Sequence, residues 1–421
     1  MKKVLVISYN WPPSGGIGVQ RWLKFSKYLP EYGWEPVILT VDPEYATYPA
    51  TDFSLLGDIP PVEVHKTRAV DWFRLLSKDK SKIPSAGFAM NTGNSFKDKV
   101  SRFIRGNFFI PDPRRGWNGY AFRKACEIIE LEKIDRIITT SPPHSTQLIG
   151  YRLRKKYPGI RWIADLRDPW TDIYYYKKFY PTPLSRMIDS SWEKRVLQKA
   201  DIITTVGGSL KTLLGSKAEG IEEKIHVVSN GYDPDDFRGM SAAFPKIFTI
   251  SYIGSLSAIQ PVDGFLDALR IVSGKGIQYN LSFTGPVPPD IRDTLSSCAG
   301  EANINFTPFS NHPTALRNML EASALLLIIP DHKSSRSIIT GKMFEYLAAG
   351  KPVICLGPPD GDAAGILNET GHGKTFDYND TAGIAGYIEK LALNRNPSHM
   401  PPPESYSRNN IAKRVAELLE K

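Results

Sequence analysis

Short apolar runs alternate with stretches of helical spacing along most of the chain. In the first half, such runs predict β-strands at residues 3–8, 34–41, 136–140, 161–165, 202–206 and 225–228. Between several of these runs, apolar residues recur at the spacing of one helix face, as they do over residues 19–32. Strands and helices that alternate in this way favour a parallel sheet with helices on both faces.

A second alternating series begins near residue 248. It predicts strands at residues 248–253, 279–284, 325–329 and 352–356, and helices at 261–273, 314–322 and 343–349. The pattern breaks over residues 233–244, where acidic residues and Gly239 interrupt it, so we expect a domain boundary there.

The two series predict an α/β chain of two doubly wound, Rossmann-like domains, residues 1–238 and 239–403. In this architecture ligands bind at the carboxyl ends of the strands, and a central cleft between the domains is the expected site. The segment 404–421 carries an apolar helical stripe at Ile411, Val415, Leu418 and Leu419, and we expect this helix to pack back on the first domain.

Bulk properties narrow the class of protein. A chain of 421 residues exceeds one ordinary core, and its 41% hydrophobic content is typical of a globular protein. The apolar run after Met1 is too short for a signal peptide, and no run approaches a membrane span. The three cysteines are far apart and the seven histidines show no ligand spacing, so we expect a reducing, cytoplasmic location and no metal site.

Positive charge is concentrated in the first half. Residues 1–240 contain 37 Lys and Arg against 27 Asp and Glu, whereas residues 241–421 contain 16 against 17. The whole excess of +9 therefore belongs to the first half, which predicts an anionic partner such as phospholipid headgroups, a lipid-linked pyrophosphate or nucleic acid.

One short predicted helix combines two kinds of polar chemistry. Thr340 and Gly341 stand at its start, where free N–H groups and the positive dipole end attract phosphate. Lys342 adds a charge in the first turn, and Glu345 lies three residues on, where a carboxylate can accept from ribose hydroxyls. An ordinary amphipathic helix with solvated Lys and Glu side chains is the alternative interpretation.

The order of these motifs resembles that of the GT-B glycosyltransferases, and the second half is similar to the retaining, nucleotide-sugar-dependent family 4. The residues that carry this resemblance are the donor-type helix 344–354 (FEYLAAGKPVI), the interdomain-type segment 228–237 (VSNGYDPDDF) and the strand-loop segment 251–257 (SYIGSLS). A glycine loop at residues 10–18 stands where the family has one that faces the acceptor.

The chain also departs from the family pattern at three positions. The family commonly has two glutamates eight residues apart; Glu345 matches the second, but Ser337 stands at the first. Ser255 and Gln260 stand where the family often has Arg and Lys that face the donor pyrophosphate, in the loop that begins with Gly254. We hypothesise that Lys342, together with Arg336, supplies the missing positive charge.

The resemblance implies a metal-independent hexosyl transfer with retention, from a UDP- or GDP-linked sugar to an acceptor that we expect to be lipid-linked, in surface polysaccharide synthesis. The nucleotide sugar is then a substrate, and no cofactor is expected. In a retaining enzyme of this kind the leaving phosphate itself helps to deprotonate the acceptor, which agrees with the lack of a convincing pair of hydrolase-type carboxylates in the sequence.

Candidate acceptor-side residues lie at predicted strand ends in the first half. Arg167 and Asp168 follow the strand at 161–165 and are candidates for catalysis, with a structural Arg–Asp pair as the alternative. His144 follows the strand at 136–140 and could bind acceptor or be an ordinary structural histidine. Gly15 and Gly16 precede a predicted helix and could admit a phosphate or an acceptor.

Other classes of protein remain open at this point. The glycines also suggest a dinucleotide-dependent oxidoreductase, although Arg21 stands where the third glycine of that fingerprint is needed. The departures in the donor motif would also suit a catalytically dead binding protein. Nucleic-acid binding lacks a recognisable motif.

Basic residues lie beside aromatic ones at 96–105 and 174–180, which predicts that the first domain docks peripherally on an anionic membrane. A helix with an ordinary solvated face is the alternative interpretation of the first stretch.

Overall fold

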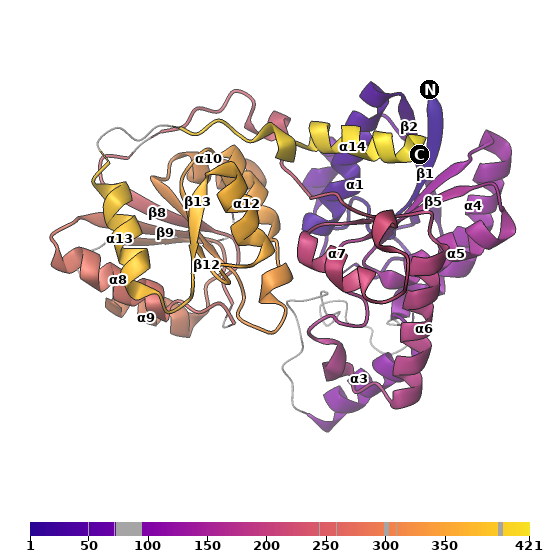
Figure 1. Cartoon of the computed structure of the whole chain (residues 1–421), viewed down its shortest axis with the longest axis horizontal. Coiled ribbons are helices and arrows are strands. Elements are labelled where there is room, and N and C mark those ends of the chain that lie inside the picture. The colour runs from indigo at the N-terminus through magenta and orange to yellow at the C-terminus, as the bar shows by residue number, and fades with distance from the viewer. Residues whose placement is uncertain are drawn as a thin grey trace. The chain divides into compact units, whose positions relative to one another are not determined.

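The computed structural model describes residues 1–48, 50–70, 72, 95–243, 245–257, 259–298, 303–308, 310–394 and 399–421. The chain forms two compact units, residues 1–229 with 408–421, and residues 230–407. Figure 1 shows each unit as a sheet flanked by helices.

The first unit contains a seven-stranded sheet in which every pair of neighbouring strands is parallel, in the order β3-β2-β1-β4-β5-β6-β7. The strands are β1 (Lys2–Ile7), β2 (Trp34–Val41), β3 (Glu63–Thr67), β4 (Arg136–Ser141), β5 (Arg161–Leu166), β6 (Ile202–Thr205) and β7 (Ile225–Val227). The strand order reverses between β1 and β4, and loops that follow these strands meet at the carboxyl edge of the sheet.

Helices cover the first sheet on both faces. They are α1 (Ile17–Tyr28), α3 (Phe96–Phe108), α4 (Asn118–Glu132), α5 (Gln147–Lys156), α6 (Pro183–Lys199), α7 (Gly208–Gly215) and α14 (Arg408–Glu420). Two buried apolar clusters, one for each face, fill the spaces between helices and sheet. The four central strands are almost wholly buried, as expected for strands covered on both faces.

The second unit repeats this plan with six parallel strands in the order β10-β9-β8-β11-β12-β13. The strands are β8 (Phe248–Ile253), β9 (Tyr279–Thr284), β10 (Asn303–Thr307), β11 (Ala324–Ile328), β12 (Val353–Leu356) and β13 (Gly373–Phe376). The helices are α8 (Asp263–Gly274), α9 (Pro289–Cys298), α10 (His312–Leu320), α11 (Gly341–Ala348), α12 (Asp362–Thr370) and α13 (Thr381–Ala392). Its strand order reverses between β8 and β11.

The predicted fold class of two doubly wound, Rossmann-like domains is therefore confirmed. Sequence reasoning did not find β3, β10 and β13, all of which lie at sheet edges. β3 and β13 are mostly half-exposed, so neither carries the continuous apolar run that identifies a central strand.

The last helix, α14, belongs to the first unit. Its stripe Ile411, Val415, Leu418 and Leu419 is buried in the same cluster as Val4 and Trp22. The unit boundaries fall after Ser229 and after Ser407, whereas the sequence analysis placed them after residues 238 and 403. In the described residues, no helix is both long and apolar enough to cross a lipid bilayer.

Candidate active site

The candidate donor-binding residues of the second unit lie where its strand order reverses. Strand β8 ends at Ile253 and runs into Gly254, while β11 leads through the short helix η9 (Ser335–Ser337) to the start of α11. Tyr346 of α11 joins these two segments, because its hydroxyl accepts a hydrogen bond of 2.9 Å from the Ile253 N–H. This is the position at which doubly wound sheets bind ligands.

Lys342 is held at this position by the end of β8. Its Nζ donates to the Tyr252 hydroxyl at 2.8 Å and lies 4.0 Å from the centre of the same ring. A Cβ atom on Gly254 would be only 2.8 Å from this Nζ, so the glycine makes room for the ammonium group. Burial lowers the pKa of Lys342 to about 7, although Glu345 acts in the opposite direction.

The first turn of α11 adds neutral donors beside this lysine. Thr340 is the N-cap residue, but its side chain caps no backbone N–H, and its buried Oγ1 has no hydrogen-bond partner among the described residues. Gly341 begins the helix without a side chain, so the backbone N–H groups of the first turn are approachable. Free N–H groups and a hydroxyl can donate hydrogen bonds to a phosphate, and an ammonium group adds positive charge.

Glu345 lies one turn further along α11 and remains partly exposed. Its Oε1 is 2.9 Å from Nε2 of His312, the first residue of α10. Sequence reasoning missed His312, because 33 positions separate the two residues and no local pattern joins them. The carboxylate is therefore oriented by α10, with its other oxygen left for a ligand hydroxyl.

Two of the three positions that depart from the family pattern, Gln260 and Ser255, contact the Tyr252 hydroxyl. Gln260 is buried and structural: its amide donates to the Tyr252 hydroxyl and to the Ile328 carbonyl, and its oxygen accepts from Ser257. Ser255 is exposed, and its carbonyl accepts a hydrogen bond of 2.9 Å from Tyr252. Both residues thus fix the hydroxyl of Tyr252, near the end of β8, which accepts from Lys342.

Arg336 and Ser337 belong to η9 rather than to α11. Arg336 is exposed and pairs with Asp360 at 2.9 Å, so its charge is already matched in the structure. Ser337 donates to the Ser334 carbonyl at 2.9 Å. Of the two cations suggested to supply the missing charge, only Lys342 has no acidic hydrogen-bond or ion-pair partner among the described residues.

In the first unit, Arg167 follows β5 and bonds to backbone. Its guanidinium donates to the carbonyls of Ser141 and Gly18, at 3.0 and 2.7 Å. Burial lowers its pKa, an effect that the charges of Asp165 and Asp168 oppose. Arg167 therefore ties the β4 end to the start of α1.

Asp168 is half-exposed, and in the described part of the chain it forms no hydrogen bond or ion pair. The structural Arg167–Asp168 pair considered from the sequence is therefore not formed, and the Asp168 carboxylate is the one left available at this strand end.

Asp165 is the buried centre of this region. Its carboxylate accepts from Arg21, Trp22, Thr140 and Thr204, at 2.8–3.1 Å. Burial alone would raise the pKa of Asp165, but the charge and hydrogen bonds of Arg21 hold it below its ordinary value. Arg21, which stands where a dinucleotide fingerprint needs glycine, is thus part of a buried ion pair.

His144 lies at the end of β4 and stacks on Trp170, with ring centres 5.1 Å apart and planes 13° apart. Burial lowers its pKa, and its buried Nδ1 has no partner among the described residues. Trp170 in turn donates to Asp189 of α6 at 2.7 Å. Stacking on Trp170 therefore holds the ring in place, with its Nδ1 buried.

The glycine loop is anchored to the segment that follows β2. Gly15 donates to the Ala50 carbonyl at 2.9 Å, and a Cβ on it would lie 3.3 Å from the Asp52 side chain. Gly16 has a φ of 97°, which favours glycine, and it directly precedes α1. Both glycines lie at the carboxyl edge of the first sheet.

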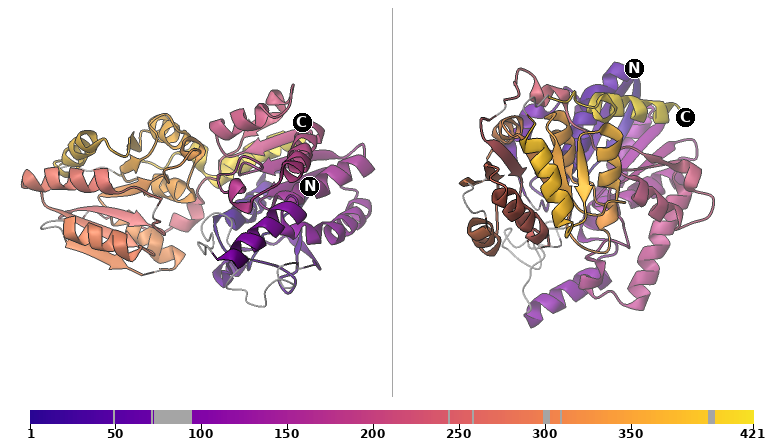
Figure 2. Two further views of the ribbon diagram at one scale, coloured as in Figure 1. Left: turned by 90° about the horizontal axis from the view of Figure 1, so that it is seen from below. Right: turned by 60° about the vertical axis from the view of Figure 1, so that its left-hand side comes forward.

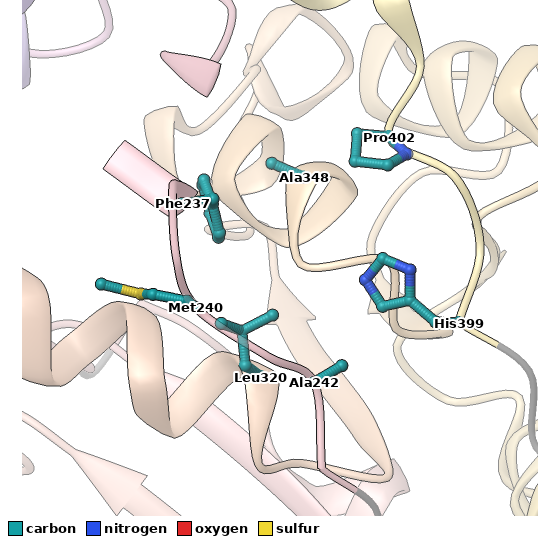
Figure 3. Close-up of a pocket in the computed structure, with 7 residues that line it drawn as sticks. All are labelled: Phe237, Met240, Ala242, Leu320, Ala348, His399 and Pro402. Carbon is teal, nitrogen blue, oxygen red and sulfur yellow. The ribbon is translucent and has the colours of Figure 1, made fainter. Parts of the chain in front are cut away.

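Two further observations concern metal binding and a hollow in the second unit. Among the residues that the structure describes, no three His, Cys, Asp or Glu side chains are arranged to hold a metal ion. A hollow of about 260 Å³ in the second unit is lined by Phe237, Met240, Ala242, Leu320, Ala348, His399 and Pro402 (Figure 3). It touches α11 at Ala348, the end opposite to Lys342, and is mostly apolar.

Comparison with known proteins identifies the family of the chain. The model of the family described as Glycosyltransferase Family 4 matches residues 18–236, slightly more than half of the chain. TuaH of Bacillus subtilis (strain 168), named as a teichuronic acid biosynthesis glycosyltransferase, is 22% identical over 254 residues. This alignment covers 56% of the chain and 62% of TuaH, so it spans less than two thirds of that relative.

Solved structures share the fold along the whole chain. A glycosyltransferase from Rickettsia africae ESF-5 has a TM-score of 0.59 at 13% identity, with 100% of this chain and 98% of that one covered. TarM and OtsA each have a TM-score of 0.60, at 12% and 14% identity, with 100% of this chain and 99% of theirs covered. At such identities the likeness shows the fold alone. With the family match over residues 18–236, it establishes that the chain is a GT-B protein and belongs to glycosyltransferase family 4.

Proposed function

We propose that the chain is a glycosyltransferase that takes a sugar from a nucleotide-sugar donor bound at the start of α11. The observation that carries this proposal is the placement of Lys342 against Gly254, beside the unpartnered Thr340 hydroxyl. The diphosphate of a donor would accept from the first-turn N–H groups and from Lys342, and a ribose would donate to Glu345.

The chemistry needs this arrangement because negative charge grows on the departing diphosphate while the sugar becomes cationic. A lysine that is only partly protonated near neutral pH when the site is empty becomes fully charged as the diphosphate develops its charge. We propose that this stabilisation replaces a metal ion and that hexosyl transfer proceeds with retention, with the leaving phosphate accepting the acceptor proton. UDP and GDP are the diphosphates to test first.

The first unit would bind the acceptor. Asp168 and His144 follow strands at its carboxyl edge, and each has a polar side-chain atom without a hydrogen-bond partner among the described residues. A Cβ on Gly16 would meet no atom within 4 Å, so this part of the glycine loop leaves open space. Arg167 would position this edge through the backbone carbonyls that it binds. We propose a lipid-linked saccharide as acceptor, in cell-surface polysaccharide synthesis; the net positive charge of the first half and the name of TuaH support this choice.

The test is thermal unfolding with a panel of nucleoside diphosphates, because a ligand that binds only the folded state raises the midpoint. We expect one diphosphate to raise the midpoint of the wild-type protein and to lose this effect in Glu345→Ala. Glu389→Ala, which removes a half-exposed carboxylate of α13, is the matched control and should respond like the wild type.

A wild-type protein that responds to none of the diphosphates would count against the proposal. Nicotinamide and flavin cofactors would then test the oxidoreductase alternative. A diphosphate response without any turnover or donor hydrolysis would instead favour a dead binding protein.

A further inference from the structure

An arm of the first unit extends away from its sheet. It consists of α3 and the first half of α6, joined through the short helix η6 (Tyr176–Phe179). In Figure 1 α6 runs downward from the sheet and α3 lies beside its lower end, and the views of Figure 2 agree.

The arm is held together by specific contacts. The Asn107 side chain of α3 donates to the Tyr180 carbonyl at 3.0 Å and accepts from Thr182 N–H and Ser185 Oγ, each at 2.8 Å. Gly106 packs so closely on Phe179 that a Cβ would lie 2.3 Å from the Phe179 carbonyl oxygen. Helix α3 is therefore fixed on η6 and α6 in one orientation.

Despite this fixed packing, the arm exposes large apolar side chains. Helix α3 has no buried residue, and Phe96 and Phe108 are 80% and 68% exposed. On α6, Leu184 and Met187 are 62% and 63% exposed. The full set of exposed apolar residues is Phe96, Val100, Phe103, Phe108, Tyr180, Leu184, Met187 and Ile188; we call it the α3–α6 surface.

Basic residues surround this surface. Residues 95–108 and 176–188 together contain seven Lys and Arg and a single acid, Asp98. Lys97, Lys99, Lys177, Lys178 and Arg186 are all exposed. Of the second basic and aromatic stretch seen in the sequence, only the Tyr180 ring is largely exposed, and α6 supplies apolar residues that sequence reasoning missed.

We infer that the α3–α6 surface inserts its apolar side chains into the interfacial region of an anionic lipid bilayer. Apolar side chains beside Lys and Arg suit this interface, since the side chains enter the acyl boundary while the cations bind headgroups. A second copy of the chain is a poorer occupant, because two surfaces with the same strong positive charge would meet. The inference rests on the proposed function for its purpose, which is to bring the protein to a lipid-linked acceptor.

The test is cosedimentation with vesicles that contain phosphatidylglycerol but neither donor nor acceptor. We expect binding that weakens as salt rises and that is nearly lost on purely phosphatidylcholine vesicles. The double variant Phe96→Ser/Leu184→Ser should bind roughly tenfold or more weakly, because it removes two of the most exposed apolar groups. Leu131→Ser/Leu393→Ser, which changes two equally exposed leucines outside the arm, should bind like the wild type.

Circular dichroism would verify that both double variants are folded. A wild-type protein that does not bind the anionic vesicles, or equal binding by both double variants, would overturn the inference. Self-association that only Phe96→Ser/Leu184→Ser abolishes, without vesicle binding, would assign the surface to a second copy instead. None of these results affects the diphosphate response, which tests the proposed function separately.

Discussion

The two units each bring a cation against a glycine at the carboxyl edge of a sheet, but one cation donates to several backbone carbonyls and the other to a single hydroxyl. A Cβ on Gly18 would lie 2.8 Å from Arg167 in the first unit, and a Cβ on Gly254 would lie 2.8 Å from Lys342 in the second. Arg167 donates to backbone carbonyls, near the buried carboxylate of Asp165. Lys342 donates to one tyrosine hydroxyl, and its pKa falls to about 7.

This difference in hydrogen-bond partners distinguishes a structural cation from a cation that we propose binds a ligand. Where protein groups already accept hydrogen bonds from a buried cation, removing one of them costs stability. Where burial lowers the pKa and no acid is bound, an incoming anion can restore the charge. The same geometric motif therefore has two uses, and four experiments can test the distinction, from the largest expected effect to the smallest.

Asp165→Ala should have the largest effect on stability. The change leaves the Arg21 guanidinium buried without its carboxylate, which we expect to cost about 3–5 kcal/mol of unfolding free energy. Urea denaturation followed by fluorescence measures it. Asp267→Ala, at an exposed ion pair of α8, serves as the control and should change stability little. An equally small change for Asp165→Ala would contradict the structural role of the network.

Lys342→Ala should lower turnover and leave stability largely unchanged. We expect turnover to fall by a factor of about 100–1,000, the typical cost of one donor to a developing negative charge, while the fold is retained. Steady-state kinetics with the donor identified by thermal unfolding, together with a denaturation curve, gives both quantities. Lys275→Ala, directly after α8, removes an exposed lysine and should leave turnover unchanged. Normal turnover in Lys342→Ala would refute the role proposed for this lysine.

The two glycines offer a matched pair of variants. Gly254 has a φ of 120°, so Gly254→Ala should cost about 1–3 kcal/mol of stability and also displace Lys342, weakening diphosphate binding. Gly18→Ala should disturb Arg167 without affecting diphosphate binding at α11. Calorimetric titration of each variant with the diphosphate measures this difference in affinity. An equal loss of affinity in both variants would contradict the assignment of diphosphate binding to Lys342 rather than Arg167.

Diphosphate affinity should also depend on pH through Lys342. Below pH 7 the lysine of the empty site is charged, whereas above pH 7 binding must draw a proton from solution. Affinity should therefore fall as pH rises above 7, by at most about tenfold per unit. Titrations from pH 6 to 9 in buffers of different ionisation heat would detect the proton uptake. Lys342→Met should show neither the decline nor the uptake; persistence of both would assign them to another group.

Much of the fold was predictable because the central strands are buried on both faces. Strands β1 and β2 contain largely apolar runs, whereas β8 and β9 alternate apolar and polar residues. All four strands were found to within about a residue. Edge strands such as β3 and β13 escaped, since half-exposed strands need no such run. The final helix was recognised from its stripe, which is buried against the first unit.

The sequence by itself determined the two doubly wound units and the position of Lys342 and Glu345 on one short helix, because these depend on local periodicity and spacing. The family followed from the resemblance of its motifs to those of known glycosyltransferases. Only the tertiary structure decided which charges are matched. Arg336 pairs with Asp360, Glu345 is oriented by His312, and Arg21 is bound to Asp165, all across separations that no local pattern encodes. Local spacing sets which side chains share a face, whereas packing decides which polar groups find a partner and which remain for a ligand.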